Sequence, residues 1–488
     1  MLFNSLEFLV FFPMVIALYF ALPAKYRWFM LLLASYYFYM SWKVEYVVLI
    51  IISTAVDFFC GRKMAALPDK SARKKYLYLS LVSNLGLLFL FKYFNFFSRS
   101  ASKIFDYLNQ SFLHWNVLHD TYTLKLLLPV GISFYTFQTL SYTIDVYNGK
   151  TKAENHLGKF ALFVSFFPQL VAGPIERSSH LLPQFHREFE FDYNRVKEGL
   201  LLMIWGFFKK LVIADRLAEY VNEVYNNVDQ YQGFYNVVAT YFFAFQIYCD
   251  FSGYSDIAIG CALIMGFSLM QNFRRPYFAT NIREFWGRWH ISLSTWFRDY
   301  LYIPLGGNRV VKWRWYYNLF ITFVVSGLWH GADWTFIVWG VLHGGYLVLG
   351  YMTQGIRNRL SKLFRLNTQS GLGKLLDMLV TFHLVVFAWI FFRANGIRDS
   401  YALVRNTFSF DMADLNNLNL FRISSDWIIS LLAILLLVII DFITERSKIR
   451  HYLNALPRLM RWALVILTLL LIVFLGKFEE QDFLYFQF

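Results

Sequence analysis

Charged side chains are scarce in this sequence. Asp, Glu, Lys and Arg make up only 16% of the 488 residues, whereas hydrophobic residues make up 57% and aromatic residues 21%. A soluble domain of ordinary composition carries about 25% charged residues. The scarcity therefore excludes an ordinary soluble domain and indicates a polytopic membrane protein.

Cysteine and metal-binding motifs are also lacking. The three cysteines, Cys60, Cys249 and Cys261, lie in apolar runs without C-x-x-C spacing. An odd number without paired spacing argues against a disulfide framework and against a cysteine zinc site. Because the chain also has no H-x-x-x-H or H-E-x-x-H motif, no metal is expected. The opening MLFNSLE lacks the basic segment that begins a cleavable signal, so Phe3 to Leu22 is predicted to be a retained span.

The formal net charge of +14 indicates cytoplasmic loops, with lipid contact at the membrane surface, and no nucleic acid is expected. The loop Gly61 to Lys75 is strongly basic and is assigned to the cytoplasm. Counting spans from it places the N-terminus, the region Ala394 to Asp426 and the C-terminal tail on the outer side. The basic loop Phe273 to Arg314 is assigned to the cytoplasm.

Apolar segments recur along the whole chain, as expected for a single all-α transmembrane domain over residues 1–488. A helix needs about 20 apolar residues to cross a bilayer, and several of these segments are shorter. They are Phe3–Leu22, Trp28–Met40, Tyr46–Cys60, Tyr76–Phe97, Leu124–Tyr147, Val196–Val212, Phe234–Cys249, Asp256–Met270, Tyr316–Trp329, Trp334–Leu349, Leu375–Phe392, Trp427–Phe442 and Trp462–Leu475. Phe160 to Gly173 is too short to cross, so it is predicted to be re-entrant or buried against protein.

His330 is the sharpest candidate for chemistry. It lies in SGLWHGADWTFIVWGVLHGG, where a helical hairpin is predicted to enter and leave on the same face. A charged residue at membrane depth costs about 2.5 to 3.5 kcal/mol, so this histidine needs a partner or a task. A neutral imidazole can take a proton from a hydroxyl that attacks an acyl carbonyl. The alternative is an inert packing histidine. The flanking Gly327 and Gly331 allow a helix break and close approach.

Other polar residues have both functional and structural interpretations. His290, in REFWGRWHISLSTWFRDY, is either functional or part of an interfacial tryptophan belt. The arginines near it could bind donor phosphates or contact anionic lipid. They are Arg274, Arg275, Arg283, Arg288 and Arg298. His343 is expected to be structural, and Asp250 and Asp256 are expected to be paired.

The C-terminal tail, residues 479–488, ends in DFLYFQF. An aromatic tail should be hidden from water, either in a groove or inserted into the protein. Insertion would bring Tyr485 near the deep histidine, where a phenol deprotonated by a base could accept an acyl group. Packing without chemistry is the alternative.

Together these motifs resemble the membrane-bound O-acyltransferase superfamily, and in particular its alginate and peptidoglycan O-acetylation branch. The resemblance is carried by FPQLVAGPIERSSHLLPQF at 167–185, YCDFSGYSDIAIG at 248–260, the basic motif at 272–309, FVVSGLWHGADWTFIVWGVLHG at 323–344 and the final YFQF. It implies a helix bundle around a membrane-crossing tunnel with re-entrant segments. His330 and His290 match the two motif histidines of the family, and Tyr485 matches a tyrosine that can relay an acyl group.

The resemblance also implies a reaction and its partners. An acyl group from a cytoplasmic thioester, acetyl-CoA or an acyl carrier, would pass to hydroxyls of an exported polysaccharide with the help of a separate extracytoplasmic acetyltransferase. Arg288, Arg298 and Arg275 are the candidates for donor binding, no cofactor is bound permanently, and the location is the bacterial inner membrane. Two alternatives remain: transfer of D-alanine or another acyl group to teichoic acid, lipid or protein, and a lipid or polymer transporter without chemistry.

Overall fold

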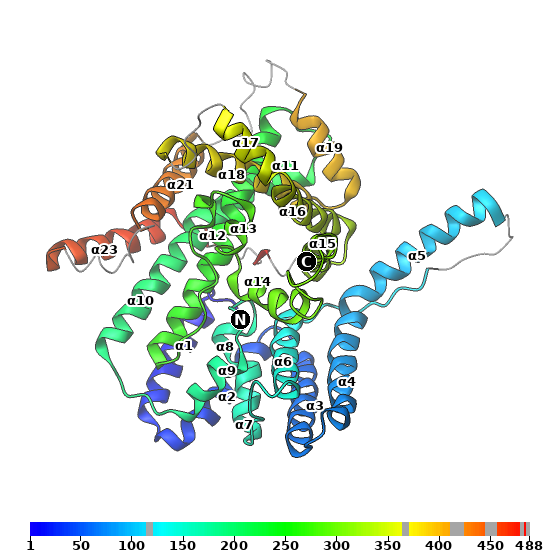
Figure 1. The fold of residues 1–488 in the computed structure, drawn as a ribbon. Coiled ribbons are helices and arrows are strands. Elements are labelled where there is room, and N and C mark those ends of the chain that lie inside the picture. The colour runs from blue at the N-terminus through cyan, green and yellow to red at the C-terminus, as the bar shows by residue number, and fades with distance from the viewer. Residues whose placement is uncertain (114–120, 364–369, 410–423, 445–455, 479–482, 485–488) are drawn as a thin grey trace.

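The computed structural model describes residues 1–113, 121–363, 370–409, 424–444, 456–478 and 483–484. Within these ranges every regular element is a helix (Figure 1). Six helical stretches are long and apolar enough to cross a membrane: Val44–Ala66, Lys70–Ser111, Trp334–Met352, Gly371–Arg393, Asp426–Thr444 and Arg458–Leu475. The prediction of an all-α, multi-pass membrane protein is confirmed.

The N-terminal third is helical, and a buried polar network joins two of its helices, α3 and α4. Its elements are α1 (Leu6–Ala21), α2 (Ala24–Met40), η1 (Val44–Tyr46), α3 (Val47–Ala66), α4 (Lys70–Leu88), η2 (Phe89–Tyr93), α5 (Phe94–Leu108), η3 (Asn109–Leu113) and α6 (Ile132–Tyr147). Asp57 of α3 accepts hydrogen bonds from Ser80 at 2.5 Å and from Asn84 at 2.9 and 3.0 Å. A buried carboxylate without hydrogen-bond partners is costly in an apolar interior. These hydrogen bonds therefore fix how α3 and α4 pack.

Residues 160–173 do not cross the bundle as a long helix. They form α7 (Leu157–Ser165) and the short α8 (Phe167–Leu170), followed by α9 (Ser178–Leu181) and η4 (Leu182–His186). All residues from Phe160 to Gly173 are buried. The prediction that this segment is buried against protein is confirmed.

The largest correction concerns the region 234–270, which was predicted as two spans. Phe234–Met265 is one helix, α12, of 32 residues, about 48 Å long at ~1.5 Å per residue. Hydropathy alone divided it at Asp250 and Asp256, but these carboxylates pair inside the protein with Lys210 and Lys209, each at 2.7 Å. The expectation that both aspartates are paired is confirmed.

Helix α12 packs closely on α10 (Tyr193–Phe207), which continues through η5 (Phe208–Ala214) into α11 (Asp215–Asn226). A Cβ on Gly206 would lie 2.7 Å from the carbonyl oxygen of Gly253, and one on Gly199 would lie 2.7 Å from that of Gly260. Only glycine permits this approach. The chain therefore runs up α10 and back down α12, which returns residue 266 to the side of residue 193.

The C-terminal half carries the predicted hairpin, which is confirmed. Its elements are η6 (Pro276–Phe278), α13 (Ile282–Trp286), α14 (Ile291–Phe297), η7 (Arg298–Tyr302), α15 (Lys312–His330), α16 (Trp334–Met352), α17 (Gln354–Leu363), α18 (Gly371–Arg393), α19 (Ile397–Thr407), α21 (Ser424–Thr444) and α23 (Arg458–Leu475). A Cβ on Gly327 would lie 2.2 Å from the carbonyl oxygen of Phe336, and one on Gly340 would lie 2.4 Å from that of Phe323. The close approach permitted by Gly327 is thus to α16.

Candidate active site

His330 is the last residue of α15, at the turn of the hairpin. Its side chain is 3% exposed and is surrounded by aromatic rings. The ring centroids of Trp329, Trp339 and Phe392 lie 5.0, 5.0 and 5.2 Å from that of His330. The helix end is held from outside the hairpin, because Nζ of Lys92 donates hydrogen bonds to the carbonyls of Trp329 and His330 at 2.8 and 2.9 Å.

His290 lies at the N-cap of α14 and is fully buried. Figure 1 shows α14 near the middle of the molecule, between α12 and α15. The ring centroids of His290 and His330 are 6.5 Å apart, and Trp329 is in contact range of both. The fold thus brings together the two histidines that the sequence singled out from separate segments.

The backbone around His290 is strained. His290 has φ 41° and Arg275 has φ 44°, and they are the non-glycine residues with positive φ in the described chain. Such a conformation costs about 1 to 3 kcal/mol and persists only where the surroundings enforce it. Here the amide of Ile291 donates to the carbonyl of Asn272 at 2.9 Å. This hydrogen bond holds the backbone beside His290, whose imidazole is fully buried.

Asn272 determines which nitrogen of His290 carries the proton. Its Oδ1 accepts from the backbone N–H of Ser292 at 3.3 Å and from the Ser292 hydroxyl at 2.7 Å. The Nδ1 of His290 lies 3.1 Å from the same oxygen. Since that oxygen can only accept, Nδ1 must be the donor. Nε2 of a neutral His290 is then an acceptor.

Burial also keeps His290 uncharged. It lowers the pKa of His290 to about 3, far below the ordinary value of about 6.5. Phe251 lies 4.6 Å from the imidazole in an edge-to-face contact, so the surroundings offer little solvation to a positive charge. At neutral pH the ring is therefore a hydrogen-bond acceptor through Nε2.

A small pocket of about 40 Å³ lies beside His330, which is one of its lining residues. Its other walls are Lys92, the segment from Leu128 into the first turn of α6 at Phe134, Val171 and Trp329. His290 lies next to this wall, because the ring centroids of Phe134 and His290 are 6.3 Å apart. The pocket therefore combines a histidine, an ammonium group and a helix N-terminus.

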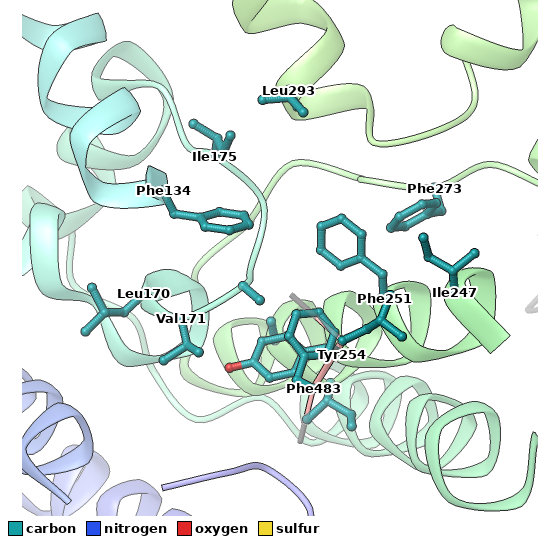
Figure 2. Close-up of a cluster of buried hydrophobic side chains, with 14 of the residues drawn as sticks. Phe134, Leu170, Val171, Ile175, Ile247, Phe251, Tyr254, Phe273, Leu293 and Phe483 are labelled. Atoms are coloured by element: carbon teal, nitrogen blue, oxygen red, sulfur yellow. The ribbon is translucent and has the colours of Figure 1, made fainter. Parts of the chain in front are cut away.

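The C-terminal segment reaches this region from another direction. Phe483 and Leu484 are 2% and 4% exposed. Phe483 packs on Tyr254 and Phe251, with ring centroids 4.9 and 5.7 Å apart (Figure 2). The amide of Leu484 donates to Asp250 at 2.9 Å. The expectation that the tail is hidden from water is thus confirmed for these two residues, whereas Tyr485 lies outside the described residues.

The arginines proposed for donor binding do not form one cluster. Arg288 pairs with Glu284 at 2.7 Å and approaches the carbonyl of Arg275 at 3.4 Å. Arg275 donates to Thr444 at 2.8 Å. Arg298 is elsewhere, beside Asp299 at 2.8 Å, with a side chain 59% exposed. Arg288 therefore contacts the backbone of Arg275, while the two guanidinium groups bind different partners, and Arg298 pairs with Asp299.

His343 contributes to packing beside the site. The indole N–H of Trp286 donates to its Nδ1 at 3.3 Å, and the Trp339 ring lies 4.9 Å away. Among the residues that the structure describes, no group of three His, Cys, Asp or Glu side chains is arranged to hold a metal.

Sequence reasoning missed two residues that shape the site, Lys92 and Asn272. Lys92 stands alone in FLFKYF, and a lone lysine inside a predicted span is a signal that could have been used. Asn272 carries no such signal, because its role depends on contacts with Ser292 and His290 that only the folded chain creates.

Comparison with known proteins adds to this geometry. Residues 77–392 match the model of MBOAT, the membrane-bound O-acyltransferase family. The chain is 40% identical to the probable alginate O-acetylase AlgI of Pseudomonas aeruginosa, over 86% of this chain and 77% of that protein. It is 32% identical to the peptidoglycan O-acetyltransferase of Helicobacter pylori, over 94% and 91%. A teichoic acid D-alanyltransferase of Bacillus subtilis is 28% identical over 54% and 68%.

Proposed function

This chain belongs to the membrane-bound O-acyltransferase family, and on that premise we propose that it moves an acetyl group from a cytoplasmic thioester donor to hydroxyls of an exported or cell-wall polysaccharide. It is a multi-pass membrane O-acyltransferase. The choice of acetyl and of polysaccharide is supported by the names of relatives that cover most of the chain, an alginate O-acetylase and a peptidoglycan O-acetyltransferase.

One observation carries the proposal. Two histidines on separate segments lie with ring centroids 6.5 Å apart in a buried aromatic site, and one of them is among the residues that line a small pocket. A lone packing histidine needs neither a second imidazole nor a pocket. A base that deprotonates a hydroxyl needs both access and a dry environment, in which electrostatic effects are strengthened.

The chemistry follows from the two rings. His330 accepts the proton of the acceptor hydroxyl as its oxygen attacks the thioester carbonyl. The carbon–sulfur bond then breaks, and the leaving thiolate takes that proton from His330. His290 stays neutral, and its Nε2, a hydrogen-bond acceptor, is proposed to share the proton that His330 holds.

The acceptor next to His330 is either the polysaccharide hydroxyl or the phenol of Tyr485. In the second case Tyr485 carries the acetyl group as an ester and passes it on. Burial of the neighbouring Phe483 and Leu484 beside Tyr254 supports a tail that enters the protein. Intact mass spectrometry and peptide mapping after incubation with labelled acetyl-CoA test this route. An unlabelled Tyr485 peptide from an active enzyme would exclude the relay.

Acetyl-CoA is the proposed donor, with no permanently bound cofactor. Arg275 and Arg288 are proposed to receive its phosphates together, because the guanidinium of Arg288 lies beside the backbone carbonyl of Arg275. Arg298, which lies apart, is proposed to contact the donor only at the protein surface. Neutralising Arg288 should raise KM for acetyl-CoA. An unchanged KM would remove Arg288 from the donor site.

The proposed location is the bacterial inner membrane, with both termini outside and a separate extracytoplasmic acetyltransferase as partner. The antiparallel packing of α10 and α12 supports this orientation. It places the basic loop after residue 266 on the same side as residue 193, as expected if both face the cytoplasm. The native cysteines are buried, so new cysteines at Lys152 and Ser98 can be labelled selectively. An impermeant thiol reagent should label the Ser98 position in intact spheroplasts and not the Lys152 position. The reverse pattern would invert the topology.

The central experiment compares His330→Ala with a matched histidine variant, His383→Ala. His383 is exposed, and its Nδ1 lies 2.7 Å from the carbonyl oxygen of Leu379 in the preceding turn of its own helix. In proteoliposomes with radiolabelled acetyl-CoA and alginate or peptidoglycan oligosaccharides, His330→Ala should abolish acetyl transfer while inserting normally, and His383→Ala should match wild type. Full activity of His330→Ala would refute the mechanism.

The same assay separates the other candidate reactions. Transfer only from a D-alanyl carrier or only from long acyl donors would replace the acetyl assignment. Movement of lipid or polymer that is indifferent to His330, without any acyl transfer, would support the transporter.

A further inference from the structure

An ammonium group lies inside a membrane helix next to the candidate base. Lys92 belongs to the apolar stretch Lys70–Ser111, within the π-helical turn Phe89–Tyr93. Ionisable residues at such depth are expensive and mark functional sites, and π-helical turns often do so as well. The direction of its side chain is therefore informative.

Lys92 turns toward the hairpin and binds its end. Its Nζ donates to the carbonyls of Trp329 and His330 at 2.8 and 2.9 Å, and it lies 5.9 Å from the centre of the Trp329 ring. The last carbonyls of a helix have no partner within the helix and carry partial negative charge. A cation placed there stabilises the C-terminal end of α15. It therefore fixes the position of the backbone from which the His330 side chain extends.

A second source of positive potential faces the same space. The pocket is bounded by Lys92, His330 and the first residues of α6, from Gly131 to Phe134. Gly131 has φ 74° and is the N-cap of this 16-residue helix, whose first-turn N–H groups are directed toward its N-terminal end. Lys92, His330 and the N-terminal residues of α6 thus line one pocket of about 40 Å³. This combination suits a negative oxygen that forms beside a base.

We propose that this pocket binds the oxyanion of the acyl-transfer transition state, and that Lys92 both positions His330 and supplies the positive charge. The inference rests on the proposed function. When the hydroxyl oxygen bonds to the thioester carbon, its proton goes to His330, and the carbonyl electron pair moves onto the carbonyl oxygen. That oxygen becomes negative next to Lys92 and the start of α6. It returns to a carbonyl when the thiolate leaves and takes the proton from His330.

Three substitutions at Lys92 separate charge from shape. Lys92→Met removes both charge and donors, Lys92→Gln keeps an N–H donor for the carbonyls without charge, and Lys92→Arg keeps both. Lys103→Met is the matched control, because Lys103 is exposed in the same helical stretch. The assay measures kcat and KM for acetyl-CoA in proteoliposomes, with folded protein quantified by size-exclusion chromatography.

We expect Lys92→Met and Lys92→Gln to lower kcat about 100- to 1,000-fold, as loss of one oxyanion donor does, with KM changed less than about threefold. Lys92→Arg should recover part of the rate, and Lys103→Met should match wild type. Equal kcat in Lys92→Gln and wild type would overturn the role of charge. Variants that lose only folded protein, or that raise only KM, would reduce Lys92 to a structural or donor-binding residue.

Assays of the wild-type protein and of His330→Ala distinguish failure of the Lys92 hypothesis from failure of the proposed function. Acetyl transfer by wild type and its loss in His330→Ala, combined with unchanged kcat in Lys92→Met, would overturn this inference alone. A wild-type protein that transfers no acetyl group would overturn the proposed function and this inference with it.

Discussion

Replacing Gly327 by alanine should displace the end of α15 and with it His330. The added Cβ would lie 2.2 Å from the carbonyl oxygen of Phe336 and 3.1 Å from its carbon. A real contact of this kind needs more than 3.0 Å, and the obstacle is backbone rather than a flexible side chain. The two helices must therefore separate by about 1 Å at this point.

The expected cost has two parts. Overpacking of a tight interface destabilises by about 1 to 3 kcal/mol, while the better helix propensity of alanine offsets about 0.5 to 1 kcal/mol. Displacing a catalytic group by about 1 Å costs about 100-fold in rate. Gly327→Ala should therefore lose much more activity than folded protein.

Gly345→Ala is the matched control on the partner helix, because no atom lies within 4 Å of the added Cβ. It should be as stable as wild type or more stable by about 0.5 to 1 kcal/mol, with unchanged activity. The measurements are thermal unfolding in detergent and acetyl transfer in proteoliposomes. Wild-type activity in Gly327→Ala would refute the argument that this helix contact sets the position of His330.

Two further predictions concern groups away from the histidines. Lys210 pairs with both Asp215 and Asp250 at 2.7 Å, so Lys210→Met should leave buried carboxylates without their cation and destabilise by about 3 to 5 kcal/mol; an unchanged unfolding temperature would contradict this. The hydrogen bond that Nδ1 of His180 donates to the carboxylate of Glu176 at 2.7 Å raises the pKa of His180 above 6.5. The contribution of the His180–Glu176 pair to folding stability should be fully present below about pH 6.5. It should be lost as the pH rises through the raised pKa of His180. His180→Gln should therefore lower the unfolding temperature slightly at pH 6 and not at pH 9, and an equal effect at both would refute it.

The membrane class and the helical hairpin could be read from the sequence because each depends on local composition. The mainly apolar segments on both sides of SGLWHG can satisfy their backbone hydrogen bonds in a membrane only by forming helices, and the break between them falls at Gly331 to Asp333. Prediction failed at α12, because a hydropathy profile scores Asp250 and Asp256 as interruptions. Their partners Lys209 and Lys210 lie on another helix, and pairing removes the cost that the profile assigns.

The sequence by itself thus determined that the protein lies in a membrane, that His330 is an exceptional residue and that its motifs are those of an acyltransferase. Tertiary structure alone decided that His290 stands beside His330, that Asn272 sets the proton of His290, and that Lys92 holds the helix end. The physical reason is the distance along the chain over which each interaction acts. Hydrophobicity and helix-breaking residues act within a few positions, whereas hydrogen bonds and charge act between segments that only the folded chain brings together.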